Sequence, residues 1–318
     1  MSSTVTTSTW KHVRARAGSF YRTRIRRDVP VLTLHRIGAG DGTSVAGLEK
    51  LLDYVTAEHQ VLTLSELAQM LRRGTRLPKN ALVLTFDDGT KDHFTLAAPA
   101  LRKRGLRGTF AVIGCTLFEQ VVPPLYWFFH LLEHTKKESV RFGFPPYLPH
   151  LELELDATGR GMLAADDSPL RRIIQASEHG LAVEVVSALG EALEVDPPAA
   201  SDLFMTFDEI RALVAEGHEA AGHSLRHQDV GEPDMATWVE DLHADFAVMN
   251  EAFGPRSHPY IYPFGRERSP AVHAKIKATG FCCAATTQWG TNTRHTDPYA
   301  LQRIGVDDDT PLPFPTIY

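Results

Sequence analysis

The sequence is poor in cysteine and has no long apolar run. Its 318 residues include three cysteines, Cys115, Cys282 and Cys283, an odd number with no Cys-x-x-Cys pair. A disulfide framework and a cysteine-based zinc motif are therefore excluded, and this usage is typical of a reducing compartment. No apolar stretch approaches the roughly 20 residues of a membrane-spanning helix. We therefore expect no transmembrane segment.

Residues 1–29 lack the apolar core of a signal peptide. They contain Ser and Thr followed by the basic run 22–27. We interpret them as a solvated basic segment, with a helix lying on a membrane surface as the alternative. The net charge of −6 gives no reason to expect nucleic acid as a partner. Together with the cysteine usage, these absences predict a cytoplasmic protein.

Short apolar runs recur along the rest of the chain, as expected for strands of a parallel sheet that is covered on both faces. Helical patterns separate most of these runs, and two of the helices begin with capping boxes, Thr63 with Glu66 and Thr206 with Glu209. The alternation predicts an α/β fold over residues 30–318, most simply a barrel. The predicted strands are Val31–His35, Ala81–Phe86, Gly108–Gly114, His218–Ser224, Tyr260–Phe264, Phe281–Thr287 and Tyr299–Val306.

The alternation is interrupted between about residues 115 and 205. This stretch begins with the aromatic block PPLYWFFHLLEH and continues to a largely helical region, Ser168–Leu193. We interpret it as a mostly helical insertion between barrel strands. Trp127, Phe128 and Phe129 are expected to form the core of the insertion, with the lining of a substrate groove as the alternative.

Two adjacent carboxylates, Asp87 and Asp88, end the apolar run ALVLTF. Like charges at the end of a buried strand repel each other unless a cation or a proton lies between them. In α/β barrels the chemistry takes place at the carboxyl ends of the strands. His223 and His35 also lie at or near the ends of predicted strands, which indicates that these residues share one site.

The stretch HSLRH places His223 and His227 four residues apart, a spacing suited to one metal ion. The pair is a weak signal among 15 histidines, but its position at a strand end beside the Asp pair strengthens it. Two imidazoles and one carboxylate leave coordination positions open, which is typical of a catalytic metal site. Zinc is favoured, and cobalt, nickel or iron would also suit these ligands.

At this point the sequence resembles the polysaccharide deacetylases that share the NodB homology domain, carbohydrate esterase family 4. The stretches LTFDDGT, GHEAAGHSLRH and YIYPFG are similar to its first three motifs. The resemblance implies a distorted (β/α)7 barrel and a metal-dependent hydrolase that removes an N-acetyl group from an amino sugar. It further implies that Asp87 is the catalytic base and that Asp88, His223 and His227 bind the metal, an assignment that the residues alone leave open between the two Asp.

The sequence departs from the family pattern in two places. The third motif usually carries an arginine that orients the base, whereas His258 stands in this neighbourhood. Arg303 could supply the guanidinium instead, or it could form a salt bridge at the barrel rim. The final Leu-His strand of the family is also absent, but Leu34-His35 ends the first strand.

A closed barrel places its first strand beside its last, so a strand can move between the termini without changing the geometry. The chain is in this respect similar to a YPFG-type branch with a permuted strand, which implies that His35 is the general acid. Tyr262, Phe264 and Trp289 are expected to bind substrate, and a backbone N–H around Phe264 is expected to stabilise the oxyanion.

Two other functions remain open from the sequence. One is a hydrolase of a non-sugar amide, and the other is a silent carbohydrate-binding domain, although the intact Asp and His residues argue against silence. The substrate is expected to be an N-acetylated carbohydrate. Whether it is a polymer, a lipid-linked saccharide or a small glycoside is left open.

Overall fold

The computed structural model describes residues 27–38, 42–165, 167–176, 179–227, 235–265 and 269–312. Most of the basic N-terminal segment lies outside these residues, as does Asp234, which the sequence suggests as a helix N-cap. Within the described ranges no helix combines the length and the apolar character needed to cross a membrane.

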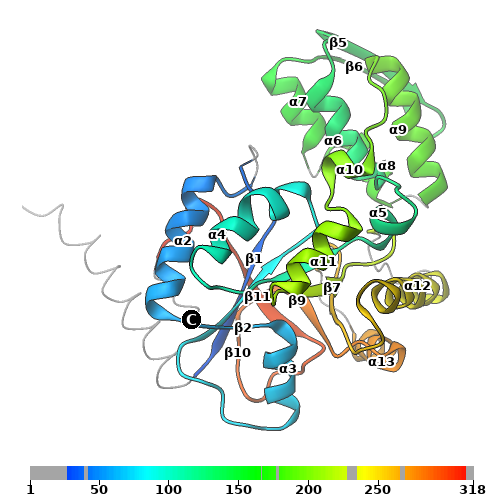
Figure 1. Cartoon of the computed structure of the whole chain (residues 1–318). Coiled ribbons are helices and arrows are strands. Elements are labelled where there is room, and N and C mark those ends of the chain that lie inside the picture. Colours follow the sequence, from blue (N-terminus) through cyan, green and yellow to red (C-terminus); the bar gives the residue numbers. More distant parts are fainter. Residues whose placement is uncertain are drawn as a thin grey trace, which may run out of the picture.

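Seven parallel strands form a closed barrel at the centre of the molecule (Figure 1). Each neighbouring pair is parallel, and β1 pairs with both β3 and β11, which closes the circle. The predicted (β/α)7 barrel is therefore confirmed, and each predicted strand overlaps an observed one. The strands are β1 (Val29–Leu34), β3 (Ala81–Phe86), β4 (Thr109–Val112), β7 (Glu219–Gly222), β8 (Pro259–Ile261), β9 (Cys283–Trp289) and β11 (Leu301–Gly305).

Two short strands that were not predicted from the sequence extend the barrel wall. β2 (Gln60–Leu62) runs parallel to the first half of β3, and β10 (Thr291–Asn292) is antiparallel to the start of β1. The register between β1 and β3 determines which residues meet at the site. Leu34 lies opposite Phe86, so the residues that follow these two strands emerge at the same height.

Alternation along the strands separates the barrel interior from its outer surface. Val31, Val83 and Leu301 belong to an inner cluster, whereas their neighbours Leu32 and Leu84 pack in an outer cluster. Buried residues of α3 join the inner cluster. α3 therefore fills one end of the barrel and leaves the carboxyl ends of the strands at the other.

Helices cover the outside of the barrel (Figure 1). Both predicted capping boxes are confirmed, at the start of α3 and of α11. Gly105 and Gly217 follow α4 and α11 with positive φ angles of 64° and 93°, as glycines at helix C-termini often do. The helical segments around the barrel, together with α3 (Leu64–Arg72) at its end, are α2 (Val45–Glu58), the π-helical η2 (His93–Ala97), α4 (Ala98–Arg102), α5 (Gly114–Phe118), α11 (Phe207–Ala215), α12 (Met235–Phe253) and α13 (Pro270–Thr279).

The insertion forms a lobe beside the carboxyl ends of the strands (Figure 1). It is mostly helical as predicted, but it also contains an antiparallel hairpin, β5 (Ser139–Phe144) and β6 (Leu148–Glu154). Its core is separate from the barrel core and includes Phe128, which is fully buried, with Trp127 and Phe129 at the margin. Its helices are α6 (Pro124–His134), α7 (Ala157–Ala164), α8 (Pro169–Ala176), α9 (His179–Leu193) and α10 (Ala200–Leu203).

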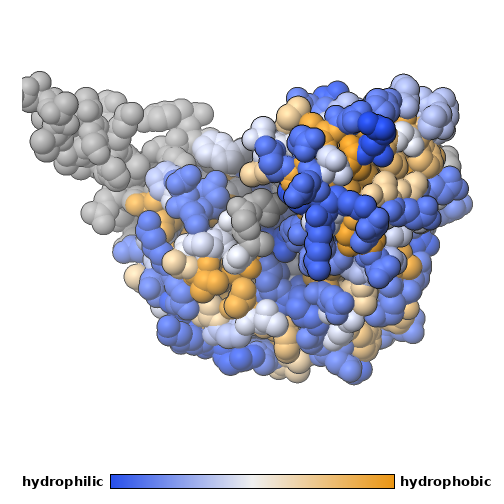
Figure 2. Space-filling model, turned by 90° about the horizontal axis from the view of Figure 1, so that it is seen from above, coloured by the Kyte–Doolittle hydropathy of each residue, from blue (hydrophilic) through white to orange (hydrophobic). Residues whose placement is uncertain are grey.

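The face seen from above in Figure 2 carries hydrophobic residues in separate patches among hydrophilic ones. The apolar side chains on this face are therefore interrupted by polar ones.

Candidate metal centre and active site

The two carboxylates at the tip of β3 diverge because the chain turns sharply there. Asp88 and Gly89 both have positive φ angles, 78° and 72°, a region that Asp tolerates better than most residues. A Cβ on Gly89 would also approach the Ala111 carbonyl at 3.3 Å, so glycine suits this position. The turn directs Asp87 toward β1 and β11, and Asp88 toward the loop after β7.

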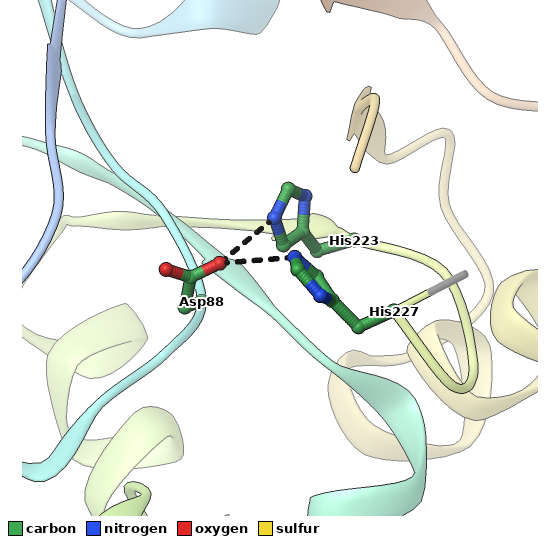
Figure 3. Close-up of side chains that lie close together, drawn as sticks. All are labelled: Asp88, His223 and His227. Atoms are coloured by element: carbon green, nitrogen blue, oxygen red, sulfur yellow. Dashed lines mark hydrogen bonds and ion pairs between the residues drawn. The ribbon is translucent and has the colours of Figure 1, made fainter. Parts of the chain in front are cut away.

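Asp88, His223 and His227 converge on one point (Figure 3). The Asp88 Oδ1 atom lies 3.1 Å from His223 Nε2 and 3.3 Å from His227 Nε2. One donor atom from each residue falls within 4.8 Å of the others, and all three side chains are nearly buried. Among the residues that the structure describes, this is the one cluster of three such donors that could hold a metal ion.

The ring of His223 is oriented for ligation. Its Nδ1 lies 2.8 Å from the backbone carbonyl of Ile261, the last residue of β8. Because a carbonyl only accepts, Nδ1 carries the proton and donates it, which leaves the Nε2 lone pair directed at the shared point. The donor set thus fits a divalent cation in composition, convergence and tautomer.

Without a cation, Asp88 accepts hydrogen bonds from both imidazoles. Burial alone would raise the pKa of Asp88, but the hydrogen bonds from His223 and His227 outweigh it and hold the pKa well below the usual value. Burial alone would lower the pKa of His223, yet its contact with Asp88 raises it overall. The carboxylate is therefore anionic, as a metal ligand must be.

The loop that carries His227 is held from behind by α12. Ser224 and His227 have positive φ angles of 66° and 55°, so the loop is not a regular turn of helix. The Asp241 Oδ1 atom accepts a hydrogen bond of 3.1 Å from the Leu225 N–H. Asp245 is fully buried beside Gly222, where a Cβ would come within 2.4 Å of its Oδ2. These contacts fix the path of the loop between its two histidines.

Asp87 forms a buried ion pair with Arg303 across the top of the barrel. Arg303 Nη1 donates to Asp87 Oδ1 at 2.7 Å, and the two side chains are 1% and 3% exposed. Arg303 is fixed further by the Thr286 carbonyl at 2.6 Å and by the Thr85 hydroxyl at 3.2 Å. It lies two residues after the inward-facing Leu301, which explains its direction into the barrel.

The ion pair decides the charge of Asp87. Burial alone would raise its pKa, but the Arg303 guanidinium, followed by the nearby histidines, lowers it below the usual value. Asp87 is therefore ionised at neutral pH. It is not part of the three-donor cluster, so the two carboxylates occupy chemically different positions.

His258 lies away from this site. Its Nε2 is 3.3 Å from the Gly254 carbonyl, and its ring packs against Phe246 and Phe253. Burial lowers its pKa to about 4, so the ring is neutral and structural. Arg303, and not His258, therefore contacts Asp87 in place of the arginine that the third motif usually carries.

His35 lies on the other side of Asp87. Its Nε2 is 4.0 Å from Asp87 Oδ2, and its side chain is 56% exposed. The backbone around it is held by residues that sequence reasoning missed. His93 Nε2 donates to the His35 carbonyl at 2.8 Å, and Asp92 accepts from the Ile37 N–H. The ring is thus presented to solvent from a fixed backbone, next to the carboxylate.

These residues open into a cavity of about 680 Å³ between the barrel and the insertion. Phe264 lines it and packs on His227, with ring centroids 4.8 Å apart. Tyr262 also lines it, but its hydroxyl donates to the Tyr299 carbonyl at 3.2 Å and is therefore turned away. Trp289 is 48% exposed at the end of β9 and does not belong to the lining.

Tyr126 of the insertion lies beside the proposed metal ligands. Its ring lies 5.8 Å from that of His227 and 5.0 Å from that of Phe204. Burial, followed by the charge of Asp88, raises its pKa well above the usual value, so its hydroxyl remains protonated. The sequence analysis named the neighbouring aromatic residues Trp127, Phe128 and Phe129. Tyr126 belongs to the same aromatic block, so its position in the sequence could have indicated it as well.

Residues 197–284 match the family model described as "Polysaccharide deacetylase". The matched segment contains His223 and His227, and it leaves out the strand that carries Asp87 and Asp88. Among curated proteins, the chain is 29% identical over 134 residues to YxkH of Bacillus subtilis (strain 168), which its name assigns to the polysaccharide deacetylases. The match covers 39% of this chain and 44% of YxkH, less than half of that relative.

Several solved structures share the fold at low sequence identity. The deacetylase PplD of Streptococcus pyogenes, solved with acetate, has a TM-score of 0.59 at 14% identity, covering 89% of this chain and 94% of PplD. IcaB from Ammonifex degensii has a TM-score of 0.58 at 17% identity, covering 89% and 93%. A de-N-acetylase of Aggregatibacter actinomycetemcomitans has a TM-score of 0.55 at 14% identity, covering 90% and 97%. At these identities the likeness establishes the fold.

Proposed function

We propose that the chain is a hydrolase of the polysaccharide deacetylase type, which removes the N-acetyl group from an amino sugar with the help of a divalent metal. The single observation that carries the proposal is the division of labour at the tip of β3. Asp88 joins two histidines in a metal-binding cluster, while Asp87 stays outside it, ionised and paired with Arg303.

A divalent cation held by Asp88, His223 and His227 would supply a Lewis acid for the acetyl carbonyl and would acidify a water bound to it. We favour zinc, since two imidazoles and a carboxylate suit it, and cobalt, nickel or iron are the alternatives to test. The remaining steps are derived from the side chains of the protein.

Asp87 acts as the general base in this proposal. It accepts the proton of the attacking water, since it is an ionised carboxylate that no ligand role occupies. Arg303 keeps Asp87 charged and fixes its orientation through the 2.7 Å contact. A backbone N–H in the turn around Phe264 donates to the carbonyl oxygen of the acetyl group, where the negative charge develops.

His35 acts as the general acid. Loss of the amine requires a proton, and His35 lies at the mouth of the cavity, 4.0 Å from Asp87. Base and acid thus share one face of the cavity. The parallel pairing of β1 with both β3 and β11 supports our assignment of the chain to the YPFG-type branch with a permuted strand.

Acetate release from an N-acetylglucosamine oligosaccharide tests the function directly. The protein is stripped with a chelator, reloaded separately with Zn²⁺, Co²⁺, Ni²⁺ or Fe²⁺, and assayed for acetate and for new primary amine. An N-acetylated peptide serves as the non-sugar amide, and Asp88→Asn serves as the matched inactive variant. We expect metal-dependent release from the sugar. Release from the peptide alone would favour a non-sugar amidase, and sugar binding without release would favour a silent domain.

The cytoplasmic location expected from the sequence stays a prediction. The three cysteines are buried free thiols in the structure, which is compatible with a reducing compartment. Fractionation of native cells would test it.

A further inference from the structure

The insertion contacts the barrel rim at three places. Its C-terminal end is tied to the turn after β3, where the Met205 N–H donates to the Gly89 carbonyl at 2.9 Å. Its helix α6 reaches the loop after β7 through the ring contact of Tyr126 with His227. Farther along α6, Glu133 Oε1 lies 3.1 Å from Arg36 Nη1 of the segment that follows β1.

The result is a cavity with two facing walls. The barrel contributes the charged residues of the site, and the insertion contributes side chains from α6, α7, α8 and α10. The volume of about 680 Å³ lies within the range of pockets that enclose a small ligand, roughly 300–1,000 Å³. The wall of the insertion is formed by Leu125, Tyr126, Phe129, His130, Gly161, Ala164, Arg171 and Leu203.

The Arg36–Glu133 pair joins the two walls next to the proposed general acid. Both residues line the cavity, and Arg36 directly follows His35. A sugar inside a long chain has a neighbour on each side, so the chain must enter on one side of the cavity and leave on another. The ion pair, the backbone hydrogen bond and the ring contact each close one possible path for such a chain.

We propose that the insertion restricts the enzyme to an acetamido sugar that is free, in a short glycoside or at the end of a chain. The inference rests on the proposed function and narrows its substrate class. Sugars in the interior of a long polymer are excluded because the insertion touches the barrel rim at three places and leaves too little room for a chain that continues in both directions. The substrate enters with its acetamido group toward Asp87 and Asp88, and any further sugars remain outside the cavity.

The test uses N-acetylglucosamine oligosaccharides of increasing length and a long soluble polymer of the same sugar. Each is incubated with the metal-loaded protein, and products are mapped by mass spectrometry. We expect one acetate per chain, removed from an end, and a rate per chain that does not rise with length. Several acetates per chain, with interior sugars deacetylated and a rate that rises with length, would overturn the inference while leaving the proposed function intact.

Substitutions test the bridge, which is the Arg36–Glu133 ion pair between the two walls. Glu133→Ala removes the link to Arg36 and is expected to raise the polymer-to-disaccharide ratio of kcat/KM by roughly tenfold, the scale of one contact in a specificity pocket. The matched control is Arg141→Ala, which breaks an ion pair of 2.7 Å to Glu152 on the exposed β5–β6 hairpin and should leave the ratio unchanged. An unchanged ratio in Glu133→Ala would overturn the role of the bridge. Absence of activity on every sugar would overturn the proposed function and this inference with it.

Discussion

The barrel rim and the insertion face each other across one cavity, but they are built on different principles. The rim presents buried charged groups that follow strand ends, and each has defined partners: Asp87 has Arg303, and Asp88 has two histidines. The insertion presents side chains from the surface of a separate core that is anchored by Phe128. The packing of its helices on this core determines which of its side chains line the cavity.

The difference assigns the proposed catalytic step to the rim and the proposed choice of substrate to the insertion. Groups at parallel strand ends share one edge of the barrel whatever the loops contain, so the proposed base, the proposed acid and the proposed metal ligands can be held at fixed distances. The insertion shapes the space above them and can change without disturbing those distances. We therefore expect variants of the rim to affect the chemical step strongly, and variants of the insertion to affect it weakly.

The largest effect should come from separating the two carboxylates. Asp88→Ala should lose bound metal and activity together, because two imidazoles alone hold a divalent ion weakly. Asp87→Asn should retain the metal and still lose activity, because an amide cannot accept the proton. Metal content by elemental analysis, measured beside acetate release, checks both. Loss of metal from Asp87→Asn with retention in Asp88→Asn would reverse the two roles.

His35→Ala should have the next largest effect. We expect normal metal content and a loss of roughly 10²–10⁴ in the rate of amide hydrolysis, the usual contribution of one acid–base group. An activated ester needs little protonation of its leaving group and should lose far less. His150→Ala, an exposed histidine on the hairpin, is the control. Equal losses on amide and ester would remove His35 from the role of acid.

Much of the rim could be predicted from the sequence because strand ends are readable. The apolar run before Asp87 and the short spacing of His223 and His227 are local signals, and the barrel brings them together. The pairing of Arg303 with Asp87 could also have been predicted from the sequence. The position of Arg303, two residues after an inward-facing leucine, places it on the inner row of β11, whereas the sequence argument treated a rim salt bridge as equally plausible.

The rest depends on contacts between distant segments that no local pattern encodes. The approach of Tyr126 to His227 depends on how α6 packs against the rim, and the bond between Asp241 and the Leu225 N–H depends on α12. The β5–β6 hairpin has alternating burial along β5, but it lies in an insertion that the sequence predicted to be mostly helical as a whole. The exposed position of Trp289 depends on where β9 ends relative to the cavity.

Arg303→Gln tests whether the rim depends on its buried ion pair. Removal of the positive charge should raise the pKa of Asp87, since Arg303 is the main influence that lowers it against burial. Asp87 acts as a base only when ionised, so the acid limb of kcat/KM against pH should move to higher pH. The free energy of unfolding should fall by about 3–5 kcal/mol, the cost of breaking a buried pair. Arg303→Lys keeps the charge and should shift the limb less.

An acid limb at the same pH in wild type and Arg303→Gln, with equal metal content, would show that Arg303 does not set the charge of Asp87. Its role would then be confined to stability.

Asp241→Ala tests the support behind the metal ligands. The loss of its bond to the Leu225 N–H should loosen the loop that carries His227 and weaken metal affinity by roughly 10–100-fold, the range found for groups that orient ligands. Asp241→Asn retains an acceptor oxygen and should restore most of the affinity. Metal titration of the stripped protein measures both. Equal affinity in wild type and Asp241→Ala would show that the loop holds its path without α12.

Tyr126→Phe is the smallest change and the sharpest test of the comparison, since it removes one hydroxyl from the insertion and keeps the ring. The hydroxyl stays protonated because burial, the charge of Asp88 and a hydrogen bond to Asp88 raise its pKa. It can donate a hydrogen bond to Asp88 or to a substrate in the cavity. One such bond contributes about 0.5–1.5 kcal/mol, and kcat/KM should fall by roughly two- to tenfold with the metal retained. Phe129→Leu, which alters the same wall without a polar group, is the control. A loss as large as that of His35→Ala would place Tyr126 among the groups that carry out the chemical step, and the division between a catalytic rim and a selective insertion would be wrong.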